Sequence, residues 1–193
     1  MLLYIHGFNS SPLSDKGVQT AEYIQQYFPQ LPFYQPQLPN CPKQAIELLS
    51  DIVNQAIARG ETPRYLGSSL GGYFASYLSE NYGGKAVLIN PAVRPYELMA
   101  ELIGEQYNPY TEQYFNVLPE HQDWLQQIDT SFIVHPDRFF VLLQTKDEVL
   151  NYRQAVAKYH CCKLLIESGG DHSFIGYSKH LANVCCFLEL TND

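Results

Sequence analysis

Residues 67–71, with the sequence GSSLG, have the composition needed to hold a reactive serine. They follow a short apolar run at 64–66 and precede a segment with helical spacing of apolar residues, which fits a strand–turn–helix unit. On such a sharp turn, flanking glycines let the strand and the helix approach closely. The free N–H groups at the helix start favour developing negative charge. Only Ser69 has glycine two positions away on both sides, so Ser69, rather than Ser68, is the candidate nucleophile.

A nucleophilic serine needs a base and an acid that orients the base, and candidates for both follow later apolar runs. Asp147 comes shortly after the run at 139–144, and His172 lies on a glycine-rich segment after the run at 163–167. His172 would take the serine proton, and Asp147 would accept the Nδ1–H of the imidazole and fix its tautomer. The chain order serine, aspartate, histidine is the order found in α/β-hydrolases.

Rival residues for these roles are present. Glu148 and Asp171 adjoin the candidate acid and base, but chain neighbours usually point apart, which favours Asp147 over Asp171. His6 follows the first apolar run, and we interpret it as a buried, hydrogen-bonded histidine that braces a loop.

The same logic predicts an oxyanion hole. In α/β-hydrolases one backbone N–H comes from the residue after the nucleophile and a second from a loop that follows an early strand. These would be the amides of Leu70 and Phe8, and Gly7 would let the loop turn tightly toward Ser69.

The elements that must position these residues alternate between strand and helix. Strands are predicted at 2–5, 33–35, 65–66, 85–90, 139–144 and 163–167, and helices at 16–28, 43–58, 70–80, 96–104, 152–159 and 181–190. This alternation predicts an α/β fold with a six-stranded, mostly parallel sheet and helices on both faces. No linker or repeat interrupts residues 1–193, so we expect a single domain.

Residues 94–137 form an insertion before the penultimate strand, in the position of a lid, and no strand of obvious strength occurs in it. Its aromatic residues could line an acyl pocket or cover the sheet: Tyr96, Tyr107, Tyr110, Tyr114, Phe115 and Trp124. Tyr110 is a candidate substrate contact. Arg94 is another, although an arginine there could also brace the loop by pairing with an acid. The small insertion favours a shallow site and short substrates.

Composition excludes several partners. The net charge of −8 argues against nucleic acid and anionic membrane surfaces, which require basic patches. The N-terminus does not resemble a signal peptide, and no apolar stretch has the length of a membrane span. The five cysteines lack zinc-like spacing and fit buried thiols in a reducing cytoplasm. No metal motif or phosphate-binding loop is present, so no cofactor is expected.

Seven stretches make the sequence resemble the YqiA-like family of small bacterial esterases with the α/β-hydrolase fold. They are 3–12 (LYIHGFNSSP), 36–39 (PQLP), 67–73 (GSSLGGY), 90–95 (NPAVRP), 108–111 (NPYT), 147–157 (DEVLNYRQAVA) and 169–172 (GGDH). One departure is Asp171, where the family pattern often has asparagine. The resemblance implies cleavage of short-chain carboxylic esters, with acyl-CoA thioesters as further substrates, and it implies that Ser69, Asp147 and His172 form the triad.

These observations predict a serine hydrolase that acts on a small-molecule ester or thioester through an acyl-enzyme. Two alternatives remain open: a lyase that uses the same triad as a base, and a binding protein that has the fold without the activity.

Overall fold

The apolar runs of the sequence form one six-stranded sheet. The structure is a computed structural model that describes residues 1–191, so residues 192–193 of the predicted domain lie outside it. In spatial order the strands are β2 (Phe33–Tyr34), β1 (Leu2–Ile5), β3 (Arg64–Ser68), β4 (Ala86–Ile89), β7 (Phe139–Gln144) and β8 (Lys163–Glu167). All neighbouring strands pair in parallel, so their carboxyl ends meet at one edge of the sheet.

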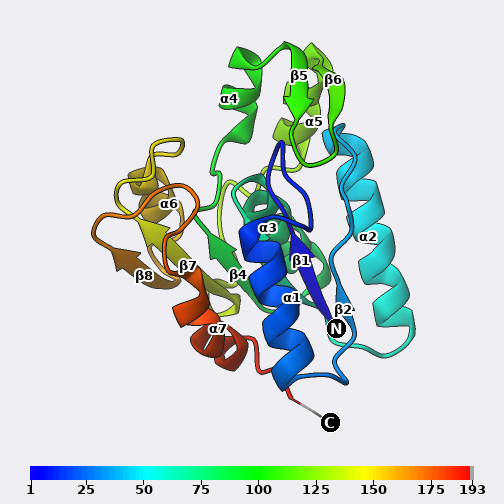
Figure 1. Cartoon of the computed structure of the whole chain (residues 1–193), viewed down its shortest axis with the longest axis vertical. Coiled ribbons are helices and arrows are strands. Elements are labelled where there is room, and N and C mark those ends of the chain that lie inside the picture. The colour runs from blue at the N-terminus through cyan, green and yellow to red at the C-terminus, as the bar shows by residue number, and fades with distance from the viewer. Residues whose placement is uncertain (192–193) are drawn as a thin grey trace.

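Helices cover both faces of this sheet, as the sequence predicted (Figure 1). α1 (Asp15–Tyr27) and α7 (Leu181–Phe187) lie on one face, and α2 (Pro42–Ala58), α3 (Leu70–Tyr82) and α6 (Tyr152–Lys158) on the other. Strand β1 shows why both faces are apolar. Leu2 and Tyr4 pack in the cluster with α1 and α7, whereas Leu3 and Ile5 pack in the cluster with α2 and α3.

The six strands predicted from the sequence leave out two short strands within residues 94–137. This insertion holds α4 (Pro95–Glu101), a hairpin of β5 (Gly104–Asn108) and β6 (Gln113–Val117), and α5 (Pro119–Gln127). The hairpin strands are largely exposed and rich in polar residues, so they lack the apolar run that marks the buried strands. Their turn is stabilised locally, because Asn108 Oδ1 accepts the N–H groups of Tyr110 and Thr111.

The insertion is packed onto the rest of the molecule. Met99, Val117 and Leu125 are buried in the core cluster that also contains α2 and α3. Asn108 donates its side-chain amide to the carbonyl of Ser10, in the loop between β1 and α1. Figure 1 shows α4, β5, β6 and α5 together at one end of the molecule, away from the N-terminus. The insertion therefore covers α2 and α3 and contacts the loop that follows β1.

Two short 3₁₀ segments complete the chain, at Pro136–Arg138 before β7 and at Tyr177–His180 before α7. The predicted C-terminal helix at 181–190 is shorter than expected, since it ends at Phe187 and Glu189 has a positive φ of 52°. Within residues 1–191, no helix combines the length and the apolar character needed to cross a membrane.

Candidate active site

Ser69 lies on a strained turn between β3 and α3. Its φ of 56° and ψ of −121° are unusual for a residue that is not glycine. Residues 65–68 and Leu70 are buried, whereas Ser69 is partly exposed. The turn therefore presents one serine side chain out of an otherwise buried segment, at the carboxyl end of a central strand.

The two flanking glycines are required by close backbone contacts. A Cβ on Gly67 would overlap the backbone of Gly71 and Gly72. A Cβ on Gly71 would overlap the carbonyl groups of Ile5 and His6, at the end of β1. These are backbone atoms of a central strand and its loop, so they cannot move as a flexible side chain would.

We expect Gly71→Ala to lower the free energy of unfolding by about 3 kcal/mol, because the new methyl group overpacks the contact between α3 and β1. Urea unfolding followed by circular dichroism measures this change. Gly60→Ala is the matched control: Gly60 has a φ of 78°, but a Cβ added there would meet open space. That control should cost about 1 kcal/mol, the strain of a left-handed alanine. Equal losses in both variants would contradict the packing argument.

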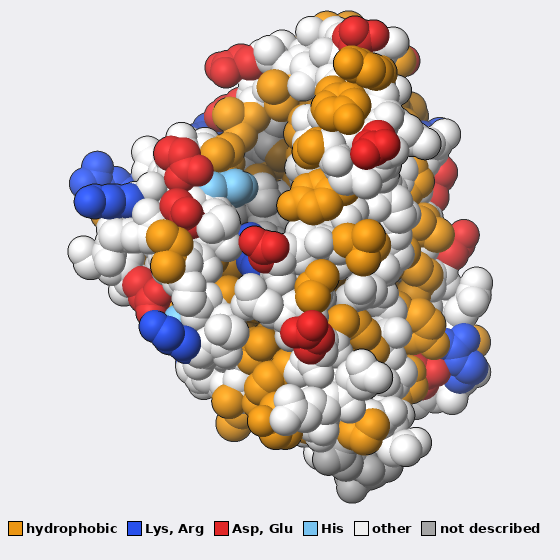
Figure 2. Space-filling view, in the orientation of Figure 1, with side chains coloured by type: hydrophobic (Ala, Val, Ile, Leu, Met, Phe, Trp, Pro, Cys, Tyr) orange, Lys and Arg blue, Asp and Glu red, His pale blue; other side chains and the backbone are white. Residues whose placement is uncertain are grey.

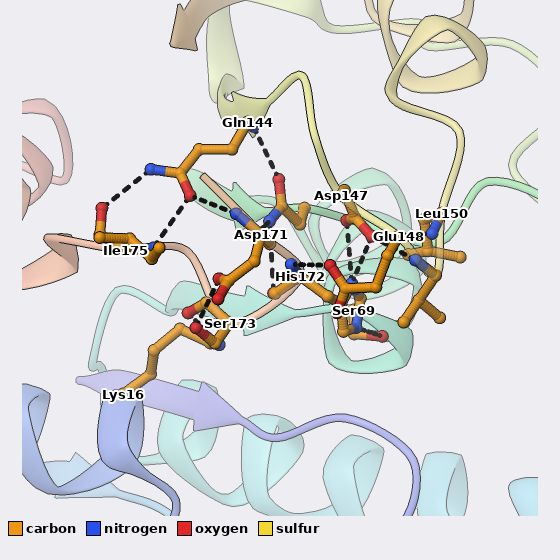
Figure 3. Close-up of polar contacts among 12 residues, drawn as sticks. Lys16, Ser69, Gln144, Asp147, Glu148, Leu150, Asp171, His172, Ser173 and Ile175 are labelled. Carbon is orange, nitrogen blue, oxygen red and sulfur yellow. Dashed lines mark hydrogen bonds and ion pairs between the residues drawn. The ribbon is translucent and has the colours of Figure 1, made fainter. Parts of the chain in front are cut away.

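His172 reaches Ser69 from the loop after β8. Its Nε2 lies 3.1 Å from Ser69 Oγ, and its Nδ1 lies 3.0 and 2.9 Å from the two carboxylate oxygens of Asp147 (Figure 3). A carboxylate can only accept, so Nδ1 carries the proton. Nε2 is then left with its lone pair directed at the hydroxyl of Ser69, which is the arrangement of a general base.

Asp147 is held in place by its own loop. Its Oδ1 accepts the backbone N–H groups of Val149 and Leu150, at 2.9 and 2.8 Å, and its side chain is 2% exposed. These donors orient the carboxylate toward His172. The structure thus brings together Ser69, Asp147 and His172, three residues selected from the sequence and separated by up to 103 positions.

The alternative candidates for the acid and the base make other contacts. Glu148 is exposed and accepts the backbone N–H of His172 instead of its ring nitrogen. Asp171 accepts the hydroxyl of Ser173. His6 is buried: its Nε2 accepts the N–H of Leu38, and its Nδ1 donates to the carbonyl of Gly7. Burial lowers the pKa of His6, which favours the neutral ring expected of a histidine that braces the loop.

Two buried amide side chains, which sequence reasoning missed, hold the loop of His172. Asn90 donates to the carbonyls of Asp171 and His172, and its Oδ1 accepts the N–H of Gln144. Gln144 in turn accepts the N–H groups of Asp171 and Ile175 and donates to the Ile175 carbonyl (Figure 3). Both residues follow or end a buried strand, which is the signal that identified Asp147 and could have identified them.

The expected oxyanion donors lie beside Ser69. Leu70 begins α3, where a backbone N–H has no partner within the helix. Phe8 follows Gly7, and a Cβ added to Gly7 would lie 3.1 Å from Ser69 Cβ, so this loop passes close to the serine. Among the hydrogen bonds of residues 1–191, neither the Phe8 nor the Leu70 N–H has a protein acceptor.

A cavity of about 510 Å³ opens next to Ser69 and His172. Figure 2 shows the molecule hollowed on the face seen in Figure 1. From the insertion, Tyr110, the candidate substrate contact, lines the cavity. Arg94 does not: it forms an ion pair of 2.9 Å with Glu97 and lines a separate groove with Lys158 and Arg153.

Two other aromatic residues of the insertion cover neighbouring elements, whereas Tyr107 and Tyr114 are exposed and contact each other on the hairpin. Phe115 packs edge-to-face against Phe8 at 5.7 Å between ring centroids, and Trp124 lies under the ammonium group of Lys43. The cavity is instead lined by several hydroxyl groups, at Tyr4, Ser10, Ser14, Ser173 and Ser178. Phe115 and Trp124 therefore cover other elements and do not line this cavity.

Comparison with known proteins places the chain in a family. Residues 1–189 match the family described as "Uncharacterised protein family (UPF0227)". UPF0227 proteins of Yersinia pestis and Yersinia pseudotuberculosis are 26% identical to this chain over 194 residues, covering 98% of this chain and 99% of theirs. The similarity therefore extends over nearly the whole length of both proteins.

Solved structures show the same fold at lower identity. Alpha/beta hydrolase domain-containing protein 10 from mouse is 15% identical, with a TM-score of 0.72, over 97% of this chain and 89% of that one. A monoacylglycerol lipase of Paleococcus ferrophilus is 14% identical, with a TM-score of 0.72, over 98% and 94%. Est1E of Butyrivibrio proteoclasticus, solved with ferulic acid, is 13% identical, with a TM-score of 0.69, over 98% and 89%. The fold is that of the α/β-hydrolases.

Proposed function

The chain belongs to the UPF0227 family and has the α/β-hydrolase fold, and from this premise we propose that it is a serine hydrolase of carboxylic esters or thioesters. The observation that carries the proposal is the continuous set of contacts from Ser69 Oγ through His172 to Asp147 on a strained turn. A surface serine without a function would not require this strain, a positioned base and a buried acid together.

In the proposed reaction, Ser69 Oγ attacks the acyl carbon while its proton passes to Nε2 of His172. The developing oxyanion is bound by the N–H groups of Phe8 and Leu70. The alcohol or thiol then leaves with the proton from His172, and an acyl-enzyme remains on Ser69. Water, deprotonated by His172, attacks this ester and releases the acid and the free serine. One water is consumed for each ester cleaved.

The shape of the cavity favours small acyl groups. With about 510 Å³ and mostly polar walls, it offers little apolar surface to a long chain. For nitrophenyl esters of increasing acyl length, we expect kcat/KM to be highest between two and about six carbons and to fall by about tenfold at twelve carbons, since apolar burial supplies the binding energy of long chains. A maximum at long chains would contradict this prediction.

The same assay, combined with serine labelling, separates the alternatives. A lyase would react with a fluorophosphonate at Ser69 but would not turn over esters or thioesters. A binding protein would do neither. Parallel measurement of an oxygen ester and a thioester with the same acyl group decides which leaving atom the site prefers.

The five cysteines are consistent with a reducing cytoplasm as the place of this activity. All five, at positions 41, 161, 162, 185 and 186, are free thiols in the structure. Disulfides are rare in proteins of reducing compartments.

A further inference from the structure

One lysine lies in the cavity that holds Ser69 and His172. Lys16 is in the first turn of α1, and its Nζ donates to the carbonyl oxygen of Ser173, the residue after His172, at 2.8 Å (Figure 3). Lys16 is the one basic Lys or Arg side chain among the described residues that line this cavity. In Figure 2 the basic side chains of this face lie mainly near its edges, and a small basic area shows within the hollow.

The ammonium group of Lys16 is half-buried and has unused donors. Among residues 1–191 it forms no ion pair, and the Ser173 carbonyl uses one of its three N–H bonds. Burial lowers the pKa of Lys16, while the carboxylates of Asp171, Asp15 and Asp147 raise it at longer range. The group is therefore partly stripped of water without a direct counter-ion, a state that a bound anion would stabilise.

Two acids also line the cavity, but their negative charges have only a weak effect on a ligand inside it. Asp15 and Glu148 are exposed, so water and salt screen their charges. Glu148 also accepts the backbone N–H of His172. A ligand group inside the cavity would therefore interact more strongly with the half-buried ammonium group than with these carboxylates.

The surrounding walls suit the oxygens of an anion. Ser10, Ser14 and Ser178 contribute hydroxyl groups, whereas the Ser173 hydroxyl already donates to Asp171. Burial raises the pKa of Tyr4 to about 12, so its hydroxyl is a neutral donor. Ser14, which precedes α1, makes no side-chain cap bond to the helix, and its Oγ lies 3.4 Å from the Tyr4 hydroxyl. These groups can hydrogen-bond to a carboxylate or phosphate that Lys16 neutralises.

We propose that Lys16 selects esters or thioesters that carry an anionic group, a carboxylate or a phosphate, on the part that occupies this cavity. The proposal rests on the proposed hydrolase function and names its substrate class. Lys16 does not exchange a proton or form a bond in the reaction. It binds the charged end of the substrate while Ser69 attacks the acyl carbon.

The test compares substrates that differ in one charge. Nitrophenyl hemisuccinate and nitrophenyl butyrate have four-carbon acyl groups with and without a terminal carboxylate. Acetoxybenzoate and phenyl acetate differ in the same way on the leaving group. For each pair, the measured quantity is kcat/KM for the charged ester divided by kcat/KM for the neutral ester. In Lys16→Met, we expect this ratio to fall by about 10- to 100-fold in at least one pair. That is the range for loss of a charge-assisted hydrogen bond.

Two further variants sharpen the comparison. Lys16→Arg keeps the charge and should retain most of the ratio. Lys163→Met removes the same charge from an exposed lysine at the start of β8, away from the carboxyl ends of the strands, and should leave the ratio unchanged because its effect is screened. Succinate and inorganic phosphate, tested as competitive inhibitors of butyrate hydrolysis, distinguish the two anion types: the one that Lys16 binds should lose affinity in Lys16→Met.

The outcomes are distinct. A selective loss in either pair supports the proposal and identifies the side of the ester that carries the anion. If Lys16→Met lowers kcat/KM equally for charged and neutral esters, Lys16 supports only the loop of Ser173, and the proposal is overturned. If the unaltered protein cleaves no ester of any kind and Ser69 is not labelled, the hydrolase function itself has failed, which the neutral esters reveal independently of Lys16.

Discussion

Replacing Ser69 by alanine is expected to lower kcat for ester hydrolysis by about 10⁶-fold, the effect of removing the nucleophile from a cooperating triad. Without Oγ, no acyl-enzyme can form, and His172 Nε2, which lies 3.1 Å from that oxygen, has no hydroxyl to deprotonate. The variant should also lose labelling by a fluorophosphonate. Steady-state kinetics on a short-chain ester and mass spectrometry of the labelled protein measure the two effects.

Ser68→Ala is the matched control for this experiment. Ser68 also lines the cavity and is the chain neighbour of Ser69, but it is buried at the end of β3, and among residues 1–191 it is Ser69, not Ser68, whose hydroxyl is hydrogen-bonded to His172. We expect it to keep its label and to lose less than about tenfold in kcat, the range of a small packing change. Persistent labelling or turnover in Ser69→Ala would place the nucleophile elsewhere.

Replacing Asp147 by asparagine is expected to lower kcat by about 10³- to 10⁴-fold through the tautomer of His172. The N–H groups of Val149 and Leu150 donate to Oδ1, so the new amide must keep its oxygen on that side. Its NH₂ group then faces His172 Nδ1, at the position of Oδ2, 2.9 Å away. Oδ1 stays 3.0 Å from Nδ1, but it already accepts two backbone N–H groups, and the NH₂ group cannot face a second donor at 2.9 Å. The tautomer with the proton on Nε2 is therefore favoured, and Nε2 can then no longer accept from Ser69.

Asp171→Asn tests whether this loss is specific to the acid that contacts the ring. Asp171 is adjacent to His172 in sequence, but its carboxylate accepts the hydroxyl of Ser173. We expect a change of less than about tenfold in kcat, as for removal of one charge in a hydrogen-bonded loop. If Asp147→Asn remained fully active while Asp171→Asn or Glu148→Gln lost activity, the orienting acid would have to be reassigned.

The strands and the candidate triad could be predicted because their signals are local. Each strand of the main sheet is an apolar run, and Ser69, Asp147 and His172 each follow one of these runs. A parallel sheet brings the carboxyl ends of its strands to one edge. Residues far apart in the chain are then expected near one another without any knowledge of their contacts, and the structure places these three within hydrogen-bond distance.

The hairpin of β5 and β6 could not be predicted in the same way. Its strands face solvent over much of their length, so their sequences lack both a continuous apolar run and clear alternation. The hairpin is stabilised by pairing between the two strands and by the burial of Val117 in a core formed mainly by other elements. That burial depends on how the insertion packs onto α2 and α3, which no local pattern records.

The sequence by itself determined the fold class, the strained serine turn and the order of the three candidate catalytic residues. The tertiary structure alone decided what surrounds them. Arg94 lies in a separate groove, and Asn90 and Gln144 hydrogen-bond to the loop of His172. Lys16 Nζ contacts the carbonyl of Ser173, which is 157 positions away in the chain. The physical reason is that periodicity and turn chemistry act over a few residues, whereas the neighbours of a side chain depend on the packing of elements distant in the chain.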